Sequence, residues 1–201
     1  MKAQVVMFDL GGVLVNVETS KCWQALANAS GHSVADVQRL LSDPKPLELF
    51  ELGQMSALQF VAHINTQLGM SWELADFAKA WNGMLSERRD VTWLLERLKT
   101  RYHLLVLSNT NVLHDEYVRR TWPSFGVVRQ WIMSYQIGYR KPEPEMYQFA
   151  LQQADAPPHA TVYVDDLEEN VSAARDLGIP SIHFTDGLKL EQELRAAGLH
   201  V

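Results

Sequence analysis

One stretch near the N-terminus decides the fold, and it reads Val5-Val6-Met7-Phe8-Asp9-Leu10-Gly11-Gly12-Val13-Leu14. An apolar run that stops at an acid and continues into glycines is typical of a buried parallel strand with a carboxylate at its C-terminal end. In open α/β sheets, ligands bind at this end of the strands. Asp9 can therefore be a nucleophile, a metal ligand or both, although an Asp in this position is also a common turn former.

Apolar runs and helical patterns alternate along the second half of the chain. Four more strands are predicted at residues 104–107, 131–134, 161–164 and 181–184. Helices are predicted at residues 112–121, 143–154 and 167–177, and Gly178 is expected to end the last of them. Strands that alternate with helices predict an α/β fold in which helices cover both faces of a parallel sheet.

The segment of residues 19–85 differs from the rest because it shows helical periodicity and no convincing strand. Short breakers, among them Ser30-Gly31 and Asp43-Pro44, divide it into several helices. A crossover between two parallel strands needs only one helix. The additional helices predict a helical cap, residues 19–85, inserted after the first strand. This cap closes over a core made of residues 1–18 and 86–201.

The composition argues against several classes of partner. The 201 residues carry a formal net charge of −6 without a run of Lys or Arg, which disfavours a nucleic-acid partner. No apolar stretch approaches the length of a membrane span, and the N-terminus shows no signal-peptide pattern. The single cysteine, Cys22, excludes an internal disulfide, and we expect a reducing, cytoplasmic setting. The sequence leaves the oligomeric state open.

Polar side chains follow the predicted strands at the same end as Asp9. Ser108 and Asn109 can donate hydrogen bonds to an anionic oxygen, together with the N-terminus of the next helix. Lys141 supplies a compact positive charge for a phosphoryl group or for a nearby carboxylate. If the strands are parallel, all these groups gather at one edge of the sheet.

Asp165 and Asp166 bring two more negative charges toward Asp9. Three crowded carboxylates repel one another and take up protons unless a cation offsets them. Oxygen ligands without softer ones favour Mg²⁺. Taken alone, each polar residue in these strand-end segments is more often a helix cap or a solvated side chain. Because all of these polar residues follow predicted strands, we expect them to form a single site.

Four segments together resemble the haloacid dehalogenase superfamily, whose members are mostly Mg²⁺-dependent phosphatases. The segments are Phe8-Asp9-Leu10-Gly11-Gly12-Val13, Leu107-Ser108-Asn109, Arg140-Lys141-Pro142-Glu143 and Asp165-Asp166. The phrases Leu-Ser-Asn-Thr-Asn and Arg-Lys-Pro-Glu are similar to the bacterial α-D-glucose-1-phosphate phosphatase-like branch. The resemblance implies a Rossmann-like core with a helical cap inserted after the first strand.

The same resemblance implies roles for the residues at the strand ends. Asp9 is then the nucleophile, and Ser108 and Lys141, with Asn109 beside them, hold the phosphoryl group of a small metabolite such as a sugar 1-phosphate. The acidic pair holds the metal together with Asp9. In this pair Asp166 is favoured as the direct ligand and Asp165 as one that acts partly through water.

One position departs from the family pattern. The phosphatases usually place a second Asp two residues after the nucleophile, where it acts as general acid and base, and this chain has Gly11 there. The backbone carbonyl of Gly11 can still bind Mg²⁺, but a glycine cannot move a proton. Loss of a positioned proton donor typically lowers the rate by about 10²–10⁴-fold.

Three functions remain open from the sequence. A phosphomonoester hydrolase with an aspartyl-phosphate on Asp9 is favoured. A haloacid-type dehalogenase also lacks the second Asp, but it needs neither a metal nor an acidic pair. A catalytically weak relative that binds a phosphorylated ligand is supported only by Gly11. Contacts that select the substrate are expected in the cap. Packing or surface roles are nevertheless favoured for each candidate, namely His32, His63, Trp72, Trp81 and the turn around Gly53.

Overall fold

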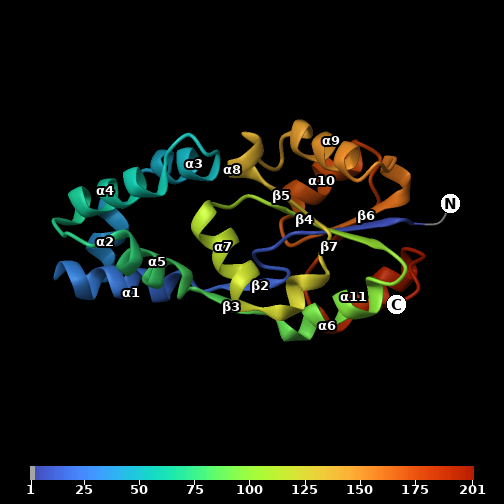
Figure 1. Ribbon diagram of the computed structural model, residues 1–201, viewed down its shortest axis with the longest axis horizontal. Helices are drawn as coiled ribbons and strands as arrows, with labels where there is room; N and C mark the ends of the chain where they lie inside the picture. Colours follow the sequence, from blue (N-terminus) through green and yellow to red (C-terminus); the bar gives the residue numbers. More distant parts are fainter. Residues whose placement is uncertain (1–2) are drawn as a thin grey trace.

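A computed structural model describes residues 3–201 as a sheet covered by helices, with a second group of helices at one end (Figure 1). The strands are β1 (Val5–Phe8), β2 (Val15–Val17), β3 (Leu85–Glu87), β4 (His103–Ser108), β5 (Gln130–Met133), β6 (Thr161–Asp165) and β7 (Ser181–His183). The helices are α1 (Thr19–Ser30), α2 (Val34–Leu40), α3 (Lys45–Glu51), α4 (Ala57–Leu68), α5 (Leu74–Asn82), α6 (Arg89–Leu98), α7 (Val112–Thr121), α8 (Ser134–Ile137), α9 (Pro144–Gln153), α10 (Glu168–Asp176) and α11 (Gly187–Ala196). Short 3-10 turns span Pro123–Val127 and Pro158–Ala160.

The main sheet has five parallel strands in the order β5-β4-β1-β6-β7, so that β1 lies in its centre. The first strand has the predicted bounds, and the other four lie where the sequence placed them, to within one residue at each end. The strand β5 ends at Met133 because Ser134 already begins α8. The predicted α/β fold with a parallel sheet is therefore confirmed.

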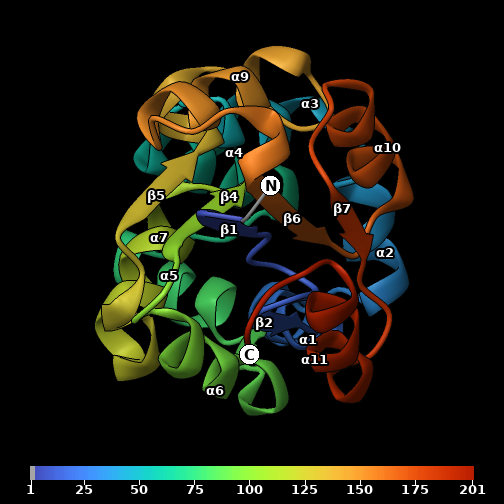
Figure 2. The same cartoon turned by 90° about the vertical axis from the view of Figure 1, so that its right-hand side faces the viewer.

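Alternate residues of β1 pack into two different apolar layers. Val6 and Phe8 belong to a cluster with the apolar residues of α6 and α11, whereas Val5 and Met7 pack with those of α9 and α10. Figure 2 shows the sheet between these two pairs of helices. A strand that is covered on both faces must be apolar throughout, which is why the β1 sequence does not alternate. Among the described residues, no helix is both long and apolar enough to cross a membrane.

Helices α1–α5 form the predicted insert after β1, and they lie together at one end of the molecule (Figure 1). The segments that lead into and out of the insert, β2 and β3, pair antiparallel and form a neck. Local signals explain several helix ends: α4 begins with a capping box at Ser56, and α1 and α4 end at left-handed glycines, Gly31 and Gly69. The two neck strands are only three residues each, and the sequence did not predict them.

Candidate active site

The register of the sheet brings the ends of β1 and β6 together. Phe8 pairs with Val164, so the residues that follow them, Asp9 and Asp165, are neighbours across the two strands. The backbone N–H of Asp9 donates to the carbonyl of Val164 at 2.8 Å. Both carboxylates are buried, and Asp165 is fully so. The sequence-based expectation that strand ends gather these acids at one edge matches their observed positions.

Lys141 lies between the two buried acids. Its Nζ is 2.7 Å from Asp9 Oδ1 and 2.7 Å from Asp165 Oδ2, and its side chain is 1% exposed. Burial alone would lower the pKa of Lys141, but the attraction of the two carboxylates outweighs burial and raises it. Burial raises the pKa of Asp9, an effect that Lys141 opposes and Asp165 reinforces. One buried ammonium group thus holds two buried carboxylates.

Asp165 is held more firmly than any other acid of the site. Besides Lys141, the Tyr163 hydroxyl donates to its Oδ2, the Asn170 amide donates to both of its oxygens at 3.1 Å, and the Leu167 N–H donates to Oδ1 at 2.8 Å. Burial by itself would raise the pKa of Asp165, but Lys141, the Tyr163 hydroxyl and the Leu167 N–H lower it. Asp165 is therefore an ionised side chain whose oxygens are already in use.

Asp166 lies beside these groups but has fewer partners. It is partly exposed, and burial and the neighbouring Asp165 raise its pKa. A Cβ atom on Gly12 would come within 2.2 Å of Asp166 Oδ2, and Gly12 has a φ of +81°, so only glycine fits there. One oxygen each from Asp9, Asp165 and Asp166 lie within 4.8 Å of one another. This oxygen-only set, with more negative than positive charge, suits a hard divalent cation.

Gly11 lines the space above this carboxylate cluster. A Cβ atom at this position would meet only Val17 Cγ2, at 3.4 Å, so sterics do not require a glycine here. The adjoining Gly12 carbonyl accepts a hydrogen bond of 2.9 Å from Arg88, the residue that follows the neck strand β3. Arg88 thereby ties the neck to the loop after β1. The role of Arg88 has no local signal in the sequence, because Arg88 and Gly12 are 76 positions apart.

Ser108 and Asn109 follow β4 and have different surroundings. Ser108 is 2% exposed and lies at the edge of the cavity described below. The Asn109 amide holds the backbone of Lys141 at both ends: its Nδ2 donates to the Lys141 carbonyl at 2.8 Å, and its Oδ1 accepts from the Lys141 N–H at 2.7 Å. The Asn109 side chain thus fixes the backbone of the lysine loop.

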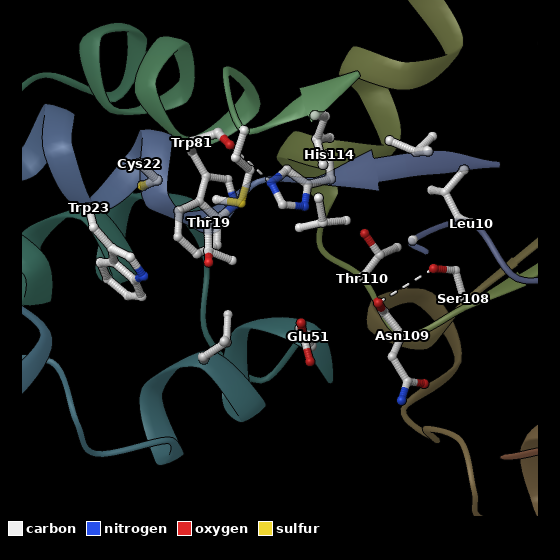
Figure 3. A pocket seen from close by; sticks show the side chains of 16 residues that line it. Leu10, Thr19, Cys22, Trp23, Glu51, Trp81, Ser108, Asn109, Thr110 and His114 are labelled. Atoms are coloured by element: carbon white, nitrogen blue, oxygen red, sulfur yellow. Dashed lines mark hydrogen bonds between the residues drawn. The ribbon is translucent and has the colours of Figure 1, made fainter. Parts of the chain in front are cut away.

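A cavity of about 270 Å³ lies between this sheet edge and the helices of the insert. Figure 3 shows Ser108, Asn109 and Thr110 on one side and Trp23, Cys22 and Trp81 on the other. Of the cap residues considered from sequence, Trp81 lines this cavity, whereas His32, His63 and Trp72 do not.

Two ionisable residues of the cavity wall were not singled out from the sequence. Glu51, at the end of α3, is 3.4 Å from Arg140, and burial raises the pKa of its carboxyl. His114, on α7, stacks on Trp81 with ring centroids 5.3 Å apart, and burial lowers its pKa to about 4. Acidic residues and histidines are common in helices. Only the three-dimensional structure therefore shows that Glu51 and His114 face the site.

Comparison with known proteins gives consistent results over the whole chain. Residues 3–178 match a family model described as haloacid dehalogenase-like hydrolase. D-ribitol-5-phosphate phosphatase from Bacteroides thetaiotaomicron is 28% identical over 200 residues, which cover 94% of this chain and 95% of that protein. Sesquiterpene phosphatase astK from Aspergillus oryzae is 28% identical over 198 residues, with 96% and 95% covered.

Solved structures show the same architecture. A haloacid dehalogenase family enzyme from Bacteroides thetaiotaomicron, solved as a magnesium complex, superposes with a TM-score of 0.85 at 25% identity and covers 97% of this chain and 100% of that one. A mutant of that enzyme, solved with magnesium and inorganic phosphate, has a TM-score of 0.78 at the same identity and covers 91% and 94%.

Proposed function

The chain belongs to the haloacid dehalogenase-like hydrolases, and we propose that it is a Mg²⁺-dependent phosphomonoester hydrolase that works through an aspartyl-phosphate on Asp9. The observation that carries the proposal is the buried ammonium of Lys141, 2.7 Å from both Asp9 and Asp165. The third acid, Asp166, lies close enough to share a cation with them. A haloacid-type dehalogenase needs neither a metal nor an acidic pair, so the cluster of three carboxylates disfavours that alternative.

The site residues suit a double displacement at phosphorus. An Asp9 carboxylate oxygen forms a bond to phosphorus while the bond from phosphorus to the alcohol oxygen breaks. Water then attacks the aspartyl-phosphate, which restores Asp9 and releases inorganic phosphate. Lys141 neutralises part of the phosphoryl charge, and Ser108 donates to a phosphoryl oxygen. Asn109 holds the Lys141 backbone through its side-chain amide, and we propose that its backbone N–H donates to the phosphoryl group.

We assign the metal to the carboxylates whose oxygens have few hydrogen-bond partners. We assign Asp9, Asp166 and the Gly11 carbonyl as direct ligands, and Asp165 as a ligand partly through water, because its oxygens already accept from Lys141, Tyr163 and Asn170. When bound there, Mg²⁺ supplies the positive charge that allows an anionic phosphoryl group to approach three acids.

The alcohol part of the substrate is a separate question. The resemblance to the glucose-1-phosphate phosphatase-like branch favours a sugar 1-phosphate, and the absence of an acid at Gly11 favours alcohols that leave easily, such as anomeric sugars and phenols. The two curated relatives act, by their names, on a polyol phosphate and on a sesquiterpene phosphate. These alcohols differ greatly in polarity, so the choice depends on this chain's own cavity.

The helical insert is proposed to be a mobile cap over this site. Residues 19–85 are then the cap, and residues 1–18 and 86–201 the core, with the hinge at β2 and β3. Lids of this kind open to admit substrate and close to exclude water. Hydrogen exchange tests the division: protection in residues 19–85 should rise when a phosphate analogue binds, whereas equal protection in both parts, unaffected by the analogue, would contradict it.

An assay with 4-nitrophenyl phosphate tests the function directly. We expect Mg²⁺-dependent release of nitrophenol that disappears in excess chelator and returns when Mg²⁺ is restored. Full activity in chelator would overturn the metal assignment. No activity toward any phosphomonoester, with Mg²⁺ present and the protein folded, would overturn the phosphatase proposal itself.

A further inference from the structure

The cavity above the catalytic loop, here called the front cavity, is mostly apolar (Figure 3). Its base is the segment after β1, and its walls come from the neck, from the segment after β4 and from α1, α3, α5 and α7. The apolar residues include Leu10, Val15, Cys22, Trp23, Met84 and Leu85. Cys22 behaves as an apolar side chain, because burial raises the pKa of its thiol to about 12 and keeps it neutral.

The ionisable groups in the upper wall are already engaged. The Glu51 carboxylate is near Arg140, and both ring nitrogens of His114 lie at 3.4–3.5 Å from polar atoms of Trp81 and Asn111. Among the described residues, the indole N–H of Trp81 has no hydrogen-bond partner. The exposed Thr19 also lines the cavity and offers a hydroxyl. A ligand would therefore find only a few hydrogen-bonding groups here, fewer than the several hydroxyls of a sugar or polyol require.

A second cavity, here called the cap cavity, lies among the helices of the insert and measures about 360 Å³. Trp23, Leu47 and Trp81 line both cavities and form the wall between them. The rest of the cap cavity is again mainly apolar, with Leu26, Leu40, Phe60, Ile64 and Phe77 among its residues. The two cavities thus follow one another from the catalytic loop into the helical bundle.

We propose that the substrate of this phosphatase is the phosphomonoester of an apolar alcohol, whose hydrocarbon chain fills the front cavity and extends past Trp23, Leu47 and Trp81 into the cap cavity. The inference rests on the phosphatase function proposed above and names its substrate class. The reaction is the same hydrolysis: water is consumed, and the free alcohol and inorganic phosphate are released.

Two opposing effects make the expected selectivity large. Each methylene that moves from water into an apolar wall improves binding by about fourfold. Each hydroxyl that loses water and finds no partner weakens binding by roughly tenfold. A chain of six to eight carbons and a polyol of similar size should therefore differ by far more than 100-fold in kcat/KM.

A series of straight-chain alkyl phosphates tests the proposal without changing the leaving group, since all are phosphates of primary alcohols. With the wild-type protein and Mg²⁺, kcat/KM should rise about three- to fourfold per methylene from ethyl to octyl phosphate. Ribitol 5-phosphate, also a primary phosphate, should be hydrolysed at least 100-fold less efficiently than octyl phosphate. A flat chain-length series, or ribitol 5-phosphate equal to octyl phosphate, would overturn the proposal.

A substitution at the shared wall locates the chain. Leu47→Trp enlarges a side chain between the two cavities and should lower the octyl-to-ethyl ratio of kcat/KM at least tenfold. The matched control is Leu58→Trp, which adds the same side chain at a cap position that is 67% exposed and should leave the ratio unchanged. An unchanged ratio in a folded Leu47→Trp protein would contradict the path through Trp23, Leu47 and Trp81.

A binding measurement covers the case in which Leu47→Trp does not fold. Octylphosphonate should inhibit wild-type hydrolysis of 4-nitrophenyl phosphate at least 30-fold more strongly than ethylphosphonate, and equal inhibition would overturn the proposal. The same assay distinguishes failure of the apolar substrate class from failure of the phosphatase function. If 4-nitrophenyl phosphate is hydrolysed but chain length has no effect, only the apolar substrate class fails. If nothing is hydrolysed, the phosphatase function fails.

Discussion

The side chains below the front cavity and those above it are held in different ways. Below it, Asp9, Lys141 and Asp165 are buried charges, each fixed by ion pairs or hydrogen bonds at the end of the sheet. Above it, the helices of the insert present a row of rings in van der Waals contact. Neighbouring rings in that row, Phe50, Phe60, Phe77 and Trp81, have centroids 4.6–5.8 Å apart. The last of them stacks on His114 of α7 at 5.3 Å.

This difference separates chemistry from selectivity. Charges below the cavity depend on exact partners, because an unpaired buried charge is strongly destabilising. Apolar packing above it is non-directional and tolerates exchange of one side chain for another of similar volume. We therefore expect substitutions below the cavity to stop catalysis or unfold the core, and substitutions above it to change which alcohol is accepted.

The largest effect should come from Asp9→Asn. An amide is nearly isosteric but is not a competent nucleophile, so turnover of 4-nitrophenyl phosphate should fall by at least about 10⁴-fold. The fold should survive. Because burial raises the pKa of Asp9, its ionised form destabilises the metal-free protein as the pH rises through that raised value, and Asn removes this effect. Undiminished turnover in Asp9→Asn would end the assignment of the nucleophile.

Lys141→Met tests the claim that the charges below the cavity depend on their partners. It leaves Asp9 and Asp165 buried without their cation and should lower the free energy of unfolding by about 3–5 kcal/mol at neutral pH. The matched control is Lys21→Met, which removes an ion pair of the same 2.7 Å length whose side chains are 51% and 50% exposed. That loss should be under about 1 kcal/mol. Urea denaturation measures both, and equal losses would remove the distinction.

Asp165→Asn and Asp166→Asn should separate structure from metal binding within the acidic pair. Asp166→Asn should raise the Mg²⁺ concentration for half-maximal activity by about tenfold or more, with little change in melting temperature. Asp165→Asn should lower the melting temperature more, because Lys141, Tyr163 and Asn170 all donate to that carboxylate. Equal shifts in Mg²⁺ dependence and in melting temperature would contradict the assignment of Asp166 as the direct ligand.

The sequence predicted the charged side of the site better than the apolar side for a physical reason. Strand ends in a parallel sheet meet at one edge, so Asp9, Ser108 and Asp165 were placed together by the order of strands alone. The cavity wall depends on how five helices pack, and no local pattern specifies that. Glu51 and His114 were missed for this reason. The hold of Asn109 on Lys141 spans 32 positions and likewise has no local signal.

Gly11→Asp tests the position where the charged residues meet the apolar front cavity. A Cβ atom there meets only Val17, at 3.4 Å, so the backbone should accept a side chain. An added carboxyl can protonate the departing alcohol, which should raise kcat about tenfold for alkyl phosphates and little for 4-nitrophenyl phosphate. If Glu51 already donates that proton, Gly11→Asp will be neutral, and Glu51→Gln will instead slow the alkyl phosphates selectively. A dependence on the leaving group that neither substitution alters would show that proton donation has another source.

The smallest expected effect concerns His114, where the apolar row of the insert meets the core. Burial lowers the pKa of His114 to about 4, below the value of about 6.5 in an unfolded chain. The unfolded state therefore binds more protons between these values. The stability from the neutral ring is complete above pH 6.5 and is lost as the pH falls toward 4, by about 2 kcal/mol between pH 7.5 and pH 5.

His114→Phe keeps an aromatic ring against Trp81 but removes the titrating group, so the melting temperature should fall less between pH 7.5 and pH 5 than in the wild type. His32→Phe, the same substitution at an exposed residue of the insert, is the control. If the melting temperatures of the wild type and His114→Phe fell equally between pH 7.5 and pH 5, the His114 ring would be hydrated in solution. The contact between α5 and α7 would then be open for part of the time, and the front cavity would be wetter than its apolar walls imply.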